Sequence, residues 1–458
     1  MSDHALRADA EAIWTAAMRA VEPASLVSTR LSLEGIDQQL LHDGRPLDPP
    51  VHFDAIERVV VVGAGKAAAG LAAGLERLLG PEILARHGVR GLVSVPAGCG
   101  RRLAAIEVRE TRPAAANLPT PAVVQATQEM LDAISNLGPR DLVIALVTGG
   151  GSALLAAPRE GISLDEKIAV TRRLSESGAD IATLNAARRR LSLVKGGGLA
   201  TACTAGRMLM VVLSDVIGDD LQVIASAPCM PPVPCMPPVP CMPPVPCMPA
   251  ASRMPAGQQA ADGTWTTPSG CRVSHLLLGT NATAVAAADD EARRRGYLVQ
   301  ACPGVASVAS DNTAESVGRH LAYEASALHA AVALDGRARA IITGGEATVV
   351  VPADHGLGGR NQQTVLAAVD QLEQEMPAWP QGVLIASVGT DGEDGPTDAA
   401  GGLADTEVIA AIREGRLDVP RALARCDAHP LLDAAGGLIR TGPTGTNVAD
   451  LRIVLARP

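Results

Sequence analysis

The sequence predicts an α/β fold with a parallel sheet that is buried on both faces. Its recurring pattern is a short apolar run, then glycines, then an alanine-rich helical stretch, as in residues 58–80, 141–155 and 338–351. Short, largely β-branched strands that alternate with helices are typical of βαβ units. Strands of such units pair in parallel and are covered by helices on both sides. The length of 458 residues leaves room for more than one domain, and we expect two.

The composition excludes several other classes of protein. Hydrophobic residues make up 47% of the chain and charged residues 19%, so buried cores are expected and disorder throughout is excluded. Aromatic residues contribute only 1% and the net charge is −10, which argues against a nucleic-acid surface. The chain has three lysines, Lys66, Lys167 and Lys195, among 39 basic residues. No apolar segment reaches the ~18 residues of a membrane span.

The N-terminal segment predicts an amphipathic helix and not a secretory signal. Charges run through it, apolar positions include Leu6, Ile13 and Met18, and Pro23 ends it. A signal peptide would need an apolar core, which this segment lacks. Because the chain is long and acidic, its nine cysteines indicate a reducing, cytoplasmic location and not a disulfide framework.

A six-residue repeat interrupts the α/β pattern. Residues 228–249 read PCMPPVPCMPPVPCMPPVPCMP and contain four of the nine cysteines. Proline excludes helix and central strand there. A soft-metal site is the alternative interpretation, but neighbouring cysteines of a polyproline II helix would lie roughly 19 Å apart. We therefore predict a surface-loop insertion near the domain boundary, with a first domain at 1–250 and a second at 272–458.

The first glycine-rich turn is GAGKAAAG at 63–70. It satisfies the loose G-x-G-x-x-A pattern of a dinucleotide site, but the next strand, 89–95, ends without the acidic residue that would bind a ribose. Lys66 stands at a helix start, where a cation is unfavourable unless an anion joins it. Anion binding is the favoured interpretation, and a solvated helix-start residue is the alternative.

A second strand-to-helix turn, TGGGSALL, lies at 148–155. Its glycines, among them Gly150 and Gly151, allow successive N–H groups to converge on one oxygen, and Ser152 adds a hydroxyl. The turn is not a Walker A loop, since no Gly-Lys-Ser/Thr follows. It predicts a phosphate cradle, with a tight turn of positive φ as the alternative.

Carboxylates, an arginine and an asparagine complete the candidates. Asp215 follows an apolar strand, where a carboxylate suits Mg²⁺ or general-base work, or caps the next turn. Arg360 follows two glycines and suits a carboxylate or phosphate, unless it is one more surface arginine. Asn447 either binds a ligand hydroxyl or stabilises its turn. The acidic loop 389–401 offers three further candidates for a metal or a substrate hydroxyl: Asp391, Asp394 and Asp398.

Taken in order, these motifs resemble those of the ATP-dependent glycerate 2-kinases, which have an N-terminal Rossmann-like domain and a MOFRL-type C-terminal domain. The resemblance runs over nearly the whole chain. It rests on eight motifs: VVVVGAGKAA (59–68), VTGGGSALL (147–155), NAARRRLSLVKGGGLA (185–200), LSDVIGDDLQVIASAP (213–228), ITGGEATV (342–349), GGRNQ (358–362), GTDGEDGPTDAAGG (389–402) and TGPTGTNVADL (441–451).

The resemblance implies transfer of the γ-phosphoryl group of ATP to the 2-hydroxyl of D-glycerate, with Mg²⁺, at an interdomain cleft. The family's functional lysine and arginine match Lys66 and Arg360, and we place Asp215 with them as catalytic. The residues that we assign to the nucleotide are Gly150, Gly151, Ser152, Lys195 and Asn281. Those that we assign to the acceptor are Glu346, Asp391 and Asn447. No metal ligands are assigned.

The chain departs from the family pattern at two informative positions. Gln363 stands where the family has Glu, and Ala227 stands where it has Gly, directly before the repeat. Two other functions stay open: an NAD(P)H-dependent hydroxypyruvate reductase and a non-catalytic sugar-acid binding protein. The expected partner is a small molecule, without nucleic acid or membrane, and a homo-oligomer is left open.

Overall fold

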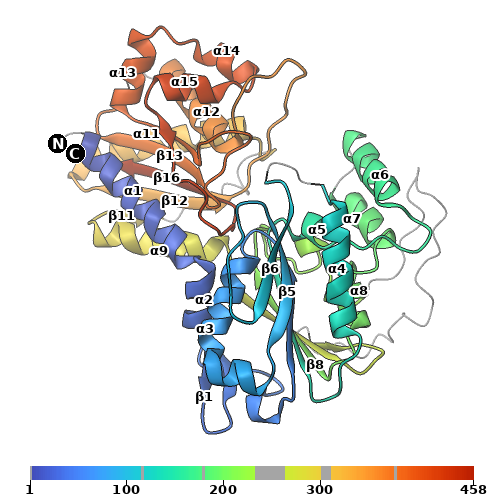
Figure 1. Cartoon of the computed structure of the whole chain (residues 1–458). Helices are drawn as coiled ribbons and strands as arrows, with labels where there is room; N and C mark the ends of the chain where they lie inside the picture. The colour runs from blue at the N-terminus through green and yellow to red at the C-terminus, as the bar shows by residue number, and fades with distance from the viewer. Residues whose placement is uncertain (1–2, 115–117, 178–180, 233–263, 301–310, 376–378) are drawn as a thin grey trace. The chain divides into compact units, whose positions relative to one another are not determined.

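The computed structural model describes residues 3–114, 118–177, 181–232, 264–300, 311–375 and 379–458 (Figure 1). The chain divides into two compact units. The central unit is residues 23–278, and the terminal unit combines residues 1–22 with 279–458. Each unit has its own sheet with helices packed against it.

These units divide the chain at residues other than the predicted limits of 1–250 and 272–458. Helix α1 (Asp3–Ala20) belongs to the terminal unit because it packs on α9 (Asn281–Arg294). Strand β10 (Arg272–Gly279) pairs with β8 (Arg207–Leu213) and so extends the central sheet. Such long-range partners leave no local signal in the sequence.

The central sheet has seven strands in the described residues, in the order β6-β5-β4-β7-β8-β10-β9. Neighbouring strands from β6 to β8 pair in parallel, as predicted. Numbered along the chain from β4, the strands from β6 to β8 follow the order 3-2-1-4-5, as in the doubly wound dinucleotide-binding fold. Its switch point lies between β4 and β7. The strands not yet bounded are β4 (Val59–Ala64), β5 (Arg90–Pro96), β6 (Ile106–Arg112), β7 (Leu142–Thr148) and β9 (Trp265–Thr266).

Helices cover both faces of the central sheet because its middle strands, β4 and β7, are apolar and buried. Every residue of β4 and β7 is buried. Helix α3 (Ala68–Arg86) packs on one face and α4 (Pro121–Ile134) on the other (Figure 1). The remaining elements of this unit are the small antiparallel sheet β1 (Leu31–Glu34), β2 (Gln39–His42) and β3 (Arg45–Pro46), and the helices α2 (Pro23–Arg30), α5 (Gly151–Leu154), α6 (Leu164–Glu176), α7 (Ile181–Arg190) and α8 (Gly198–Ala202).

The terminal sheet is mixed, with the described order β11-β12-β16-β13-β14-β15. Strand β12 (Arg339–Gly345) is parallel to β11 (Leu298–Gln300) but antiparallel to β16 (Asp450–Ala456). The parallel pairing expected for the strand around 338–351 is therefore confirmed with β11 and wrong for β16. The last strand of the chain inserts between β12 and β13 (Val383–Gly389), antiparallel to both. A buried apolar run does not reveal strand direction.

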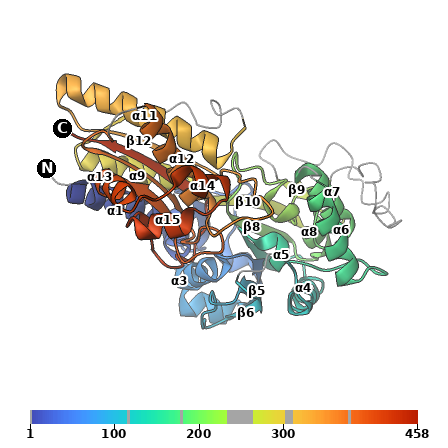
Figure 2. The ribbon, with the colours of Figure 1, turned by 90° about the horizontal axis from the view of Figure 1, so that it is seen from above.

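Helices α11 (Ala314–Asp335) and α12 (Arg360–Glu375) lie side by side on the terminal sheet (Figure 2). The predicted amphipathic helix at the N-terminus is confirmed as α1, with Leu6 and Ile13 buried. The smaller elements of this unit are β14 (Gly401–Ala404), α13 (Thr406–Glu414), α14 (Val419–Ala424), α15 (Ala428–Ala434) and β15 (Leu438–Ile439).

Most of the proline-rich repeat, residues 233–249, lies outside the described residues, so its predicted role as a surface insertion stays a prediction. In the described first part of the repeat, Cys229 is buried, and its carbonyl oxygen accepts a 2.9 Å hydrogen bond from Trp265 Nε1. Among the helices that the structure describes, none is both long enough and apolar enough to cross a membrane.

Candidate functional site

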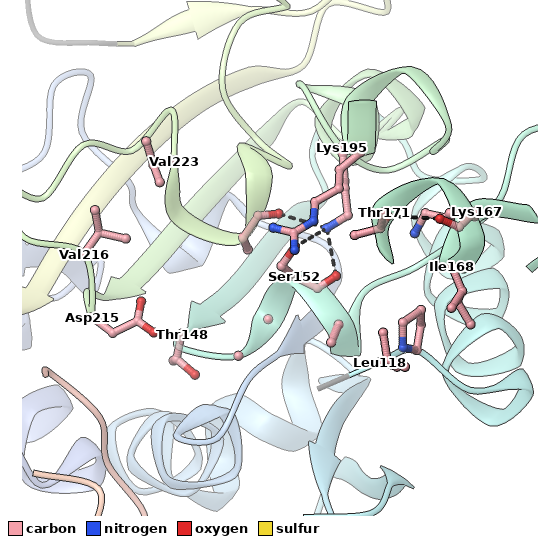
Figure 3. A pocket seen from close by; sticks show the side chains of 16 residues that line it. Leu118, Thr148, Ser152, Lys167, Ile168, Thr171, Lys195, Asp215, Val216 and Val223 are labelled. Atoms are coloured by element: carbon pink, nitrogen blue, oxygen red, sulfur yellow. Dashed lines mark hydrogen bonds between the residues drawn. The ribbon is translucent and has the colours of Figure 1, made fainter. Parts of the chain in front are cut away.

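A cavity of about 230 Å³ lies where β7 and β8 end in the central unit (Figure 3). The turn after β7 lines it with Thr148, Gly150, Gly151 and Ser152, and Asp215 lines it from the segment after β8. The carboxyl ends of parallel strands beside a switch point are the usual ligand site of such sheets. The structure therefore brings the predicted phosphate turn and Asp215 to one cavity.

Lys195 lines this cavity, and the three N–H groups of its ammonium all donate to neutral acceptors. Its Nζ donates to Ser152 O at 2.9 Å, to Ser152 Oγ at 3.1 Å and to Ala225 O at 3.2 Å (Figure 3). Lys195 is 1% exposed. Burial, with the nearby positive charges of Lys167 and Arg188, lowers the pKa of Lys195 well below its ordinary value. Lys195 thus ties the TGGGS turn to residue 225.

The cavity carries more positive than negative charge. Lys167 and Arg188 line it together with Lys195, whereas Asp215 is the one carboxylate among its described lining residues. Lys167 is 4% exposed, and burial and the charge of Arg188 lower its pKa to about 8. A buried cluster of cations without matching carboxylates favours an anionic ligand.

The backbone N–H groups of Lys66 and Ala67 in the GAGK turn already donate hydrogen bonds within the protein. The N–H of Lys66 donates to Gly149 O at 2.9 Å, and the N–H of Ala67 donates to Thr148 Oγ1 at 3.1 Å. Gly65, with φ of +137°, is required here because a Cβ would lie 2.0 Å from Thr148 Oγ1. These N–H groups are not available to a phosphate, so only the Lys66 side chain can serve one.

The Lys66 side chain lies against the TGGGS turn. Its Cγ is 3.8 Å from the position that a Cβ on Gly150 would take, and Arg112 Nη2 is 3.5 Å from the same point. Helix α5 starts at Gly151, and the first N–H groups of a helix have no acceptor within it. The second turn, not the first, is therefore the better phosphate cradle.

Three consecutive non-glycine residues next to the cavity adopt left-handed conformations. Ala225, Ser226 and Ala227 have φ of 49°, 62° and 61°. Left-handed φ costs about 1–2 kcal/mol per residue with a Cβ. Hydrogen bonds hold the segment, among them Gly196 N to Ser226 O at 3.0 Å. The departure from the family's glycine at Ala227 therefore places strain beside the site.

In the terminal unit, Arg360 lies at the centre of a cluster of carboxylates. Its Nε and Nη2 donate to the two oxygens of Asp450 at 2.7 and 2.9 Å, and its Nη1 lies 2.9 Å from Glu346 Oε1. Burial opposes the charge of Arg360, but Asp450 and Glu346 outweigh it and raise its pKa. Partial burial and the charges of Asp450 and Asp391 raise the pKa of Glu346. Arg360 is thus a fixed guanidinium and not a loose surface arginine.

The start of α12, which carries Arg360, is capped by a buried carboxylate from the 389–401 loop. Asp394 accepts hydrogen bonds from Asn361 N at 3.0 Å and from Gln362 N at 2.9 Å. Burial raises the pKa of Asp394 to about 6, although these N–H groups oppose the shift. The GGRNQ and GTDGEDG motifs therefore meet at one helix N-terminus.

The remaining predicted residues of the terminal unit make contacts that stabilise the backbone. Asn281 Nδ2 donates to Val448 O at 2.8 Å and to Asp450 O at 2.9 Å, which joins α9 to β16. Asn447 Oδ1 accepts from Ala449 N at 3.1 Å within its own turn. Asp391 Oδ1 accepts from Glu393 N at 3.1 Å. Their assignments to ligands stay predictions.

The glutamine that replaces the family's glutamate points away from this cluster. Gln363 Nε2 donates to Glu315 Oε1 at 2.7 Å on α11 and to Leu423 O at 2.9 Å. A glutamate at this position would face the carboxylate of Glu315. Glutamine at position 363 therefore makes a contact between α12 and α11. Its presence in place of glutamate does not remove a carboxylate from the surroundings of Arg360.

Sequence reasoning missed Lys167 and Arg188 as cavity residues. Lys167 follows Glu166 in a polar helix without a motif, and Arg188 is the first of three consecutive arginines on α7. The scarcity of lysine was the available signal. Lys167 and Lys195 both line the cavity, and Lys66 lies against its glycine-rich turn.

The described residues contain no group of three or more His, Cys, Asp or Glu side chains arranged to hold a metal ion. An ion bound wholly by such side chains is therefore not expected there. A single cavity carboxylate, Asp215, does fit Mg²⁺ that arrives on phosphate oxygens and keeps several waters.

Two family models match the chain. The model described as "Domain of unknown function (DUF4147)" matches residues 9–236, and the MOFRL family model matches residues 339–450. Together they span parts of both compact units.

Curated relatives and a solved structure are similar to the chain over most of its length. A glycerate kinase of Mus musculus is 32% identical, with 100% of this chain and 94% of that protein aligned. A D-glycerate 2-kinase of Thermotoga maritima is 33% identical, over 87% and 91%. A protein named putative hydroxypyruvate reductase of Agrobacterium vitis is 35% identical, over 87% and 99%. The crystal structure of glycerate kinase from Thermotoga maritima matches with a TM-score of 0.74 and 28% identity, covering 99% of this chain and 100% of that one.

Proposed function

Because the chain belongs to the glycerate kinase family, we propose that it transfers the γ-phosphoryl group of ATP to the 2-hydroxyl of D-glycerate. The observation that carries the proposal is the cation-rich cavity beside the glycine turn of β7. The hydroxyl oxygen attacks the γ-phosphorus, and the bond to the bridging oxygen of ADP breaks. The hydroxyl proton is released to water, so the products are 2-phosphoglycerate, ADP and one proton.

Positioning and charge stabilisation are what an enzyme mainly supplies in such a transfer. The TGGGS turn holds the phosphates, Lys195 fixes that turn through its bonds to Ser152, and Lys66 stabilises the charge on the group in transfer. Arg360 binds the carboxylate of glycerate, for which its rigid pairing with Asp450 sets the orientation. The net charge of −10 repels both substrates, so these local cations must outweigh the field of the whole chain.

Magnesium fits this scheme with Asp215 as its protein carboxylate. When bound, the ion would neutralise charge on the β- and γ-phosphates. Asp215 lies directly after the end of β8 and lines the same cavity as Ser152 and Lys195. The chain's own contribution is to hold the phosphates beside that carboxylate.

Product analysis tests the proposal. The full chain is incubated with ATP, Mg²⁺ and D-glycerate, and the product is identified by phosphorus NMR. We expect the 2-phosphoglycerate signal and stoichiometric ADP. A signal for 3-phosphoglycerate would overturn the regiochemistry, and a lack of any phosphoglycerate would overturn the kinase assignment.

A reductase of hydroxypyruvate is the second candidate, because an Agrobacterium vitis relative has that name. The structure gives it little support. The N–H groups of Lys66 and Ala67 are bonded within the protein, and β5 ends at Pro96, followed by Ala97. A dinucleotide site would need free N–H groups in that turn and a carboxylate after that strand. Oxidation of NADH by hydroxypyruvate without ATP would favour this alternative.

The Asp394 cap predicts an acid limb in the pH profile. Its carboxylate is ionised above a pKa of about 6 and protonated below it. Protonation removes charge from the cap of the helix that starts with Arg360, so kcat/KM for glycerate is expected to fall as pH decreases through about 6. The measurement is kcat/KM from pH 5 to 8. In the Asp394→Asn variant, which cannot ionise, this limb should vanish, and a limb that persisted would contradict the assignment.

A further inference from the structure

We propose that Lys167 on α6 and Arg188 on α7 bind the terminal phosphates of the nucleotide and select a triphosphate over shorter phosphate chains. The proposal rests on the proposed kinase function and gives a role to two residues that the sequence analysis left without one. Both side chains line the cavity at the end of β7. Figure 3 shows Lys167 there together with Ser152 and Lys195.

The first support is that Lys167 is buried and has no acceptor among the residues that the structure describes. The residue is 4% exposed, and its Nζ makes no hydrogen bond or ion pair with any residue that the structure describes. In the described part of the chain, Arg188 Nη1 donates to one neutral acceptor, Asn185 Oδ1, at 3.3 Å. An isolated buried cation is costly in free energy. An anion in the cavity would relieve that cost.

The second support is that packing alone does not require these charges. Helices α6 and α7 are held by a small apolar cluster of their own, formed by Val170, Leu174, Ala187 and Leu191. Lys167 and Arg188 lie outside that cluster. Their position on the cavity wall therefore indicates a ligand and not a role in joining the two helices.

The third support is the charge of the cavity, which suits a polyphosphate better than a single carboxylate. Lys167, Arg188 and Lys195 contribute three cations, and Asp215 contributes one anion. A singly charged sugar acid would leave positive charge uncompensated. A triphosphate with Mg²⁺ has enough oxygens and negative charge to interact with all three cations. A nucleotide with fewer phosphates would lose part of that interaction.

Binding of such an anion must also change the protonation of Lys167. The charged groups that act on it are Arg188 from α7 and Lys195 after α7. With the cavity empty, burial and Arg188 lower the pKa of Lys167 to about 8. Phosphate oxygens favour the charged form, so at pH 8 about half a proton should be taken up by Lys167 on binding.

Calorimetric titrations of the full chain with ATP, ADP and AMP test the proposal. We expect Lys167→Met to weaken ATP binding at least tenfold, ADP binding less, and AMP binding not at all, with Arg188→Met behaving alike. Arg173→Met, an exposed arginine on the same helix, is the matched control and should bind as the parent does. Unchanged ATP affinity in Lys167→Met, or an equal loss for AMP, would overturn the proposal.

The Lys167→Arg variant separates charge from folding. Arginine stays protonated, so this variant should keep ATP affinity within a few-fold but lose about half a proton of uptake at pH 8, measured in buffers of different ionisation enthalpy. Equal uptake in parent and variant would contradict the inference. If the parent bound ATP in this way but did not phosphorylate glycerate, the acceptor assignment would fail while the phosphate site stood.

Discussion

Replacing Lys66 by alanine is expected to lower kcat for glycerate phosphorylation by about 10²–10³-fold, the effect of removing one preorganised charge donor from a transition state. The loss should appear mainly in kcat, because the TGGGS turn, fixed by Lys195, still holds the ground-state phosphates. The fold should survive, since the Lys66 backbone N–H keeps its bond to Gly149 O. Steady-state kinetics with varied ATP measure kcat, and a thermal unfolding scan measures the stability of the fold.

Two variants control this result. Lys66→Arg retains the positive charge and should recover part of kcat. Arg86→Ala, in the last turn of α3, removes a charge from the far end of the same helix and should leave kcat unchanged. A Lys66→Ala enzyme with parental kcat would show that the transferred phosphoryl group is not stabilised by this lysine.

Replacing Arg360 by alanine is expected to lower both stability and activity. Asp450 is 1% exposed and would lose its bidentate partner, and breaking a buried pair in this way costs about 3–5 kcal/mol of unfolding free energy. Denaturant unfolding measures that loss. Turnover of glycerate should fall as well, because the carboxylate of the acceptor loses its guanidinium.

A double variant separates the two consequences. In Arg360→Ala with Asp450→Asn, the buried carboxylate is replaced by a neutral amide, so part of the unfolding free energy should return. Activity should not return with it. If the double variant regained both, Arg360 would serve only to neutralise Asp450, and the proposed contact with glycerate would be wrong.

Local sequence signals predicted the central unit well. The apolar runs before GAGK and TGGG are β4 and β7, and their turns meet as the parallel pattern requires. The same signals could not show that β16, at the end of the chain, separates β12 from β13 in an antiparallel direction. Strand direction and long-range pairing depend on tertiary packing, which a short apolar run does not encode.

Prediction of individual site residues was less complete, for a related reason. Glycine turns and their neighbours, such as Ser152 and Lys195, have recognisable patterns. Lys167 acquires its character from burial beside Arg188, and only the fold supplies that. Conversely, Asn281 lies at a helix start, as a ligand residue would, but its amide donates to the backbone of β16. A motif gives the position of a residue in the fold, but it does not show which atoms accept the hydrogen bonds that the residue donates.

The packing of α1 on α9 has a consequence for synthesis of the chain. Residues 1–22 leave the ribosome before their partners in the terminal unit, which begin at residue 279. At about 5–20 residues per second, the intervening residues take roughly 10–50 s to translate. During that interval the apolar face of α1, including Ile13, has no native partner, while the central unit is one continuous stretch that can fold. Nascent chains therefore have a window in which this helix is a natural site for chaperone binding.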